Sequence, residues 1–139
     1  MRRRYRTPIR NLPMEKDPRD TYPINVINLR DKPLLEALFE VEKRPWLWLQ
    51  NHDLPCLMSF VNGWVVGRND AKDDKLLTAF DLFVAKELDE GSSTVGWCNM
   101  ILKHFGEQDA IAAFFRLLRQ FQIMQVTQAR LQVGALNGT

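Results

Sequence analysis

The sequence predicts a mainly α-helical fold, a compact bundle of four to five short helices preceded by an extended basic N-terminal arm. Apolar residues recur at three- and four-residue spacing in several segments, as they do on one face of a helix. Polar stretches with helix-capping residues separate these segments. The 139-residue chain is 45% hydrophobic and carries eight Phe and four Trp, which is enough apolar area for a core without disulfides or metal.

Length and local composition indicate one domain with a segment of different character at each end. Residues 1–21 are expected to form a flexible basic arm, because three prolines interrupt any helix there and apolar residues are few. Residues 22–124 are expected to form the helical domain. Residues 125–139 are expected to be a flexible C-terminal tail, because large apolar residues become scarce there.

The first part of the domain combines an extended segment with one helix. Residues 22–29 (YPINVINL) alternate loosely and are expected to form a short strand or an extended segment. A first helix is expected to start at Pro33, with Asp31 as its cap. The Arg44–Pro45 step disfavours helix at the residue before the proline, so residues 46–49 are expected to be extended.

Two more helices are expected in the middle of the chain. Asp53 is expected to cap the second helix, which has a proline in its first turn and Gly67 just past its end. Asp73 or Asp74 is expected to cap the third helix after a fully polar loop.

Gly106 is expected to separate the last two helices. Ser93 or Thr94 is expected to cap the fourth helix, and Glu107 opens the fifth. The large apolar residues of these patterns predict the core. The expected core residues are Phe60, Trp64, Phe80, Phe83, Trp97, Ile101, Phe114, Leu118 and Phe121.

The net charge of +2 conceals an asymmetry between the arm and the rest of the chain. Residues 1–32 carry nine Arg and Lys against four Asp and Glu, a net of +5, while residues 33–139 carry a net of −3. A basic arm of this kind can contact nucleic acid, an acidic partner or its own body, and it can also be a solvated tail. Translation from Met14 would remove most of it. Nucleic-acid binding would use Arg2, Arg3, Arg4, Arg6 and Arg10.

Residue types that perform catalysis or bind metals are scarce, with two His and two Cys. His52 and Cys56 have the i, i+4 spacing of a ligand pair, but a helix start falls between them, and zinc needs three or four ligands. Cys56 and Cys98 lie among apolar neighbours, whereas a catalytic thiol needs an electropositive, accessible setting. We expect both cysteines to be reduced and buried, with no catalytic residue, metal or cofactor. An enzyme that pairs one of them with His52 or His104 is the remaining alternative.

The hydropathy pattern also limits the cellular location. No apolar run reaches the roughly 18 residues that a membrane span requires. The basic N-terminus is not followed by the apolar stretch of a signal peptide. We therefore expect no membrane association and a cytoplasmic location.

The segment RPWLWLQ is the most unusual part of the sequence. Alternate side chains of an extended segment point to opposite sides, so only half of residues 46–49 can face the core. The other half is expected to bind a protein partner or a second copy, since Trp is enriched at interface hot spots. A lid over the core is the alternative. The expected contact residues are Arg44, Trp46, Trp48 and His52.

Four segments of the chain carry a resemblance: YPINVINLRDKP, KRPWLWL, LPCLMSFVNGW and GWCNMILKHFGEQDAIAAFFRLLRQF. They resemble a set of small bacterial cytoplasmic proteins, some of which lie in toxin–immunity loci. The resemblance covers residues 22–122 and carries no catalytic motif. It implies a helical fold and a protein that neutralises a partner. The sequence therefore predicts a non-enzymatic protein-binding module, such as an immunity-type inhibitor, with nucleic-acid binding through the arm as the alternative.

Overall fold

The computed structural model describes residues 29–137. The chain divides into two units, residues 1–32 and residues 33–139. The first unit contributes one described element, the 3-10 helix η2 (Leu29–Asp31). The arm, the alternative start at Met14 and all but the last residue of the expected segment 22–29 lie outside the described residues.

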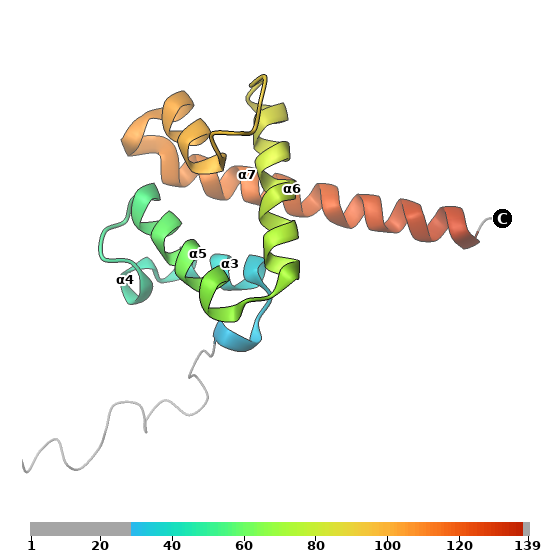
Figure 1. The fold of residues 1–139 in the computed structure, drawn as a ribbon, viewed down its shortest axis with the longest axis horizontal. Helices are drawn as coiled ribbons and strands as arrows, with labels where there is room; N and C mark the ends of the chain where they lie inside the picture. The colour runs from blue at the N-terminus through green and yellow to red at the C-terminus, as the bar shows by residue number, and fades with distance from the viewer. Residues whose placement is uncertain (1–28, 138–139) are drawn as a thin grey trace, which may run out of the picture. The chain divides into compact units, whose positions relative to one another are not determined.

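Helices form the whole regular structure of the described part of the second unit, so the predicted mainly α fold is confirmed (Figure 1). The elements are α3 (Leu34–Lys43), the single turn α4 (Pro45–Trp48), α5 (Leu54–Arg68), α6 (Ala71–Glu87) and α7 (Trp97–Asn137). Helix α7 packs against α6, α5 and α3.

Gly106 divides α7 into two helical segments, as the sequence predicted. Its backbone has φ 81° and ψ 164°, which lies outside the helical region. Residues with a Cβ rarely adopt this conformation, whereas glycine does so without steric cost. The chain therefore changes direction at Gly106, between residues 97–105 and residues 107–137.

Local capping chemistry is correct at Asp53 and differs from the prediction at the starts of α3, α6 and α7. The Asp53 carboxylate accepts a hydrogen bond of 2.8 Å from the Cys56 N–H. Helix α3 has no side-chain cap among the described residues, and Asp31 lies in η2 instead. The start of α7 is held by Asp81, sixteen residues earlier, which accepts a hydrogen bond of 2.7 Å from the Trp97 N–H. Ser93 and Thr94 were therefore the wrong prediction.

The connection between α5 and α6 also corrects two predictions. Helix α5 ends one residue after Gly67, and Asn69 takes the left-handed conformation there (φ 50°, ψ 47°), which asparagine tolerates better than most residues. Helix α6 begins after Asp70, whose carboxylate accepts a hydrogen bond of 2.9 Å from the Lys72 N–H. Asp73 and Asp74 lie in its first turn instead.

The core lies between α3, α5, α6 and α7, and its aromatic cluster centres on Phe80. Its ring lies 5.3 Å from the ring of Phe121, 5.6 Å from Phe114 and 6.0 Å from Trp97, measured between centroids. Seven of the nine predicted core residues are buried. Phe60 and Trp64 are half-buried, because they lie on the side of α5 that turns toward α4.

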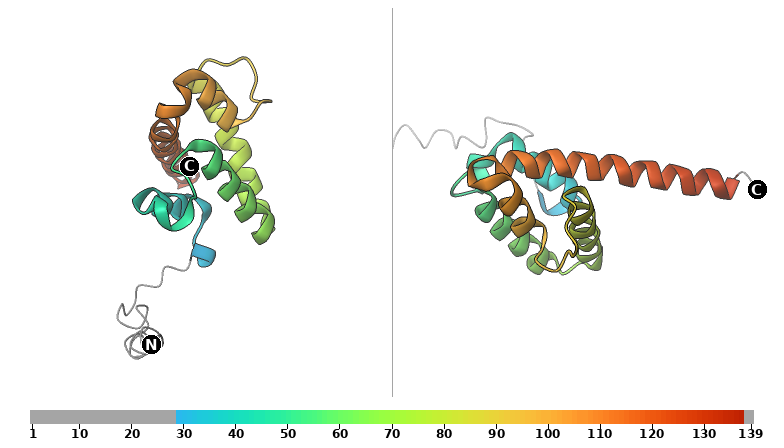
Figure 2. Two further views of the ribbon diagram at one scale, coloured as in Figure 1. Left: turned by 90° about the vertical axis from the view of Figure 1, so that its left-hand side faces the viewer. Right: turned by 90° about the horizontal axis from the view of Figure 1, so that it is seen from above.

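Residues 125–139 were predicted to form a flexible C-terminal tail, and they are helical as far as Asn137. Residues 125–137 continue the helix, and Figure 2 shows this part extending away from α3 to α6. Large apolar residues are scarce in this part, but Gln, Ala, Arg and Leu are good helix formers, so the sequence favours helix there without burial.

Candidate partner-binding site

Helix α4 turns the Trp-rich segment into a compact helical turn. The N–H of Leu47 donates to the carbonyl of Arg44 (3.0 Å), and the N–H of Leu49 donates to the carbonyl of Pro45 (2.8 Å). Proline fits the first position of a helix, where its missing N–H has no partner to lose. The Arg44–Pro45 step thus starts a helix instead of an extended segment. We call residues 44–52 the Trp46 turn.

The helical geometry changes which side chains of the Trp46 turn face solvent. Trp46 is 72% exposed and Leu47 is 55% exposed, whereas Leu49 is buried. The half-buried Trp48 packs edge-on against Phe60, with ring centroids 6.4 Å apart. The two Trp side chains were expected on the same side of an extended segment. This was wrong, because residues two positions apart in a helical turn point about 200° apart, toward opposite sides.

A shallow depression lies beside the exposed Trp46 side chain. Pro45, Trp46, Leu49, Gln50 and His52 line it. The structure thus brings together two of the four predicted contact residues, Trp46 and His52. The other two, Arg44 and Trp48, do not line the depression.

The Trp48 side chain is part of an aromatic row that supports the Trp46 turn. Phe60 lies between Trp48 and Trp64, with its centroid 6.2 Å from that of Trp64. The indole N–H groups of Trp48 and Trp64 are buried and find no hydrogen-bond acceptor in the part of the chain that the structure describes. The ring contacts of this row pack the Trp46 turn against α5.

The C-terminal end of α5 joins α6 through Arg68. Its guanidinium lies 5.0 Å from the ring centre of Trp64, and its Nε lies 3.4 Å from Oδ2 of the buried Asp73. The Asp73 carboxylate is therefore kept next to a cation, although Oδ2 makes no hydrogen bond within residues 29–137. Asp73 does not cap α6, because it is the third residue of the helix.

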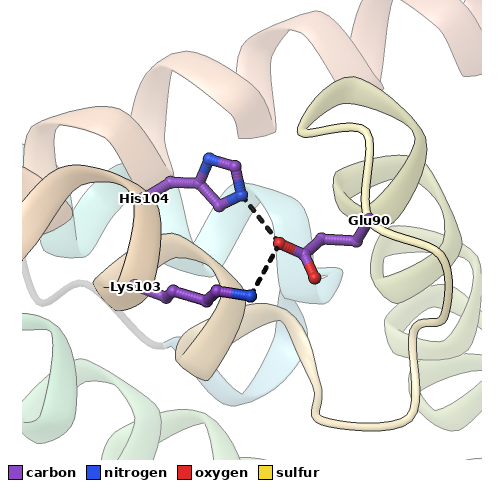
Figure 3. Close-up of polar contacts among 3 residues, drawn as sticks. All are labelled: Glu90, Lys103 and His104. Carbon is purple, nitrogen blue, oxygen red and sulfur yellow. Dashed lines mark hydrogen bonds and ion pairs between the residues drawn. The ribbon is translucent and has the colours of Figure 1, made fainter.

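Glu90 is the centre of the polar cluster in Figure 3. Its Oε2 lies 2.7 Å from Nε2 of His104 and 3.4 Å from Nζ of Lys103. The His104 hydrogen bond lowers the pKa of the Glu90 carboxyl, and the Lys103 charge adds to the effect. The cluster links the loop after α6 to the first segment of α7. It contains one acid and two basic side chains, and we call it the Glu90 clamp.

The two cysteines are free thiols in different environments. Cys98 is buried, as predicted, whereas Cys56 is half-exposed in the first turn of α5. Burial raises the pKa of the Cys98 thiol, which disfavours the reactive thiolate. Among residues 29–137, no three His, Cys, Asp or Glu side chains form a group that could hold a metal ion.

Two further predictions concern the membrane and nucleic acid. None of the described helices has the length and hydropathy needed to cross a membrane. The arginines predicted for nucleic-acid binding lie outside the described residues, so that alternative stays a prediction.

One exposed surface, on the last part of α7, was not predicted from the sequence. Ile123, Val126 and Val133 are each at least 45% exposed there. Their spacing could have revealed a second apolar face, had residues 125–139 been treated as a helix.

Comparisons with known proteins place the chain in no family. No family model, curated protein or solved structure matches it.

Proposed function

We propose that this protein is a protein-binding module and that it binds its partner through the Trp46 turn. The observation that carries the proposal is the 72% exposure of Trp46 beside an exposed Leu47. Two large apolar side chains that are exposed next to each other make an unfavourable contact with water. Burial in an apolar pocket of a partner protein would remove this contact.

The turn is also held in place, which reduces the entropy lost on binding. Backbone hydrogen bonds from Leu47 and Leu49 close it, and Trp48 anchors it on Phe60. Tryptophan side chains at such positions dominate the binding energy of many interfaces.

The charges around the turn indicate the partner's chemistry. Lys43 and Arg44 are exposed directly before α4, and residues 45–51 carry no charge. Lys43 already pairs with Glu40, with 3.2 Å between Nζ and Oε2. The matching surface is therefore an apolar pocket with an acidic group facing Arg44.

An immunity-type inhibitor is the finer form of the proposal, and it rests on the resemblance of residues 22–122 to small bacterial proteins. In this form the protein acts in the bacterial cytoplasm, and its partner is a toxin encoded beside its own gene.

The test is affinity capture from the native host with the full chain, followed by binding measurements on the recovered protein. Trp46→Ala should weaken binding about 30-fold or more, as expected for a hot-spot residue, and leave the melting temperature unchanged. Leu82→Ala is the control, because Leu82 is 59% exposed on a different helix. Equal binding by the two variants would contradict the proposal. Failure of the wild-type chain to retain any protein in the capture experiment would also contradict it.

A further inference from the structure

We draw no further inference here: the strongest candidate, the exposed apolar face on the last part of α7 formed by Ile123, Val126, Ala129 and Val133, carries none, because nothing in the structure shows what covers it.

Discussion

The two halves of the last helix have the same backbone structure and opposite environments. Between Ala110 and Phe121, eight side chains are buried, whereas none is buried between Gln122 and Gly134. Both halves are nevertheless helical. The difference shows that helix formation follows from local residue preferences, while burial depends on what the rest of the chain places against the helix.

Among these variants, Phe114→Ala should cause the largest loss of stability. It tests the buried half of the helix. Phe114 is 1% exposed and lies 4.9 Å from Trp97 between ring centroids. Truncation should cost about 3–5 kcal/mol through lost burial and a cavity. Ile123→Ala, on the exposed half, should cost less than about 0.5 kcal/mol. Urea denaturation of both variants checks the contrast, and equal losses would show that the second half is also packed.

Gly106→Ala should cost about 1–3 kcal/mol, because its backbone conformation is almost restricted to glycine. A Cβ at this position would meet nothing within 4 Å, so the cost comes from the backbone alone. Gly134→Ala is the matched control in the exposed half, where the space is equally open and the backbone is helical. It should increase helicity in circular dichroism without lowering the unfolding free energy. Equal tolerance of both substitutions would contradict the role of Gly106.

Asp81→Ala should cost about 1–2 kcal/mol, because the Trp97 N–H at the start of α7 loses a charged acceptor. Asp81→Asn keeps an oxygen acceptor and should cost less.

Partial burial raises the pKa of Asp81, although its hydrogen bond from Trp97 opposes the shift. The native state therefore binds a proton at Asp81 more tightly than the unfolded state does. The stabilisation from this protonation is present below the ordinary Asp pKa and falls as pH rises through the raised pKa. The free energy of unfolding of Asp81→Asn, measured across acidic pH, should not show this decline.

Glu90 should show the opposite pH dependence. The His104 hydrogen bond lowers its pKa, so the contribution to stability is present above the ordinary Glu pKa and is lost as pH falls through the lowered one. Glu90→Gln should therefore flatten the acid side of the stability curve. An acid side that matches the wild type in this variant would show that the clamp in Figure 3 contributes nothing to stability.

Deletion of residues 125–137 should have the smallest effect on stability. It is the most direct test of the contrast between the two halves of α7. This part contains no fully buried side chain between Gln125 and Gly134, so the melting temperature should stay within a few degrees. A large loss of stability would mean that the second half of α7 supports the core.

Much of the fold follows from local chemistry, which the sequence by itself determined. The periodic apolar residues, the Asp53 cap and the break at Gly106 each depend on residues within a few positions of one another. Seven of the nine predicted core residues are buried for the same reason, because their helical spacing already defines one face.

Tertiary structure decided the features that depend on distant residues. Asp81 reaches Trp97 across sixteen residues, so its role was not apparent from local pattern. Trp46 and Trp48 have the same local sequence signal, but only Trp48 has Phe60 to pack against. Burial is a property of the assembled helices, and the sequence alone does not specify which side of a short apolar turn will meet them.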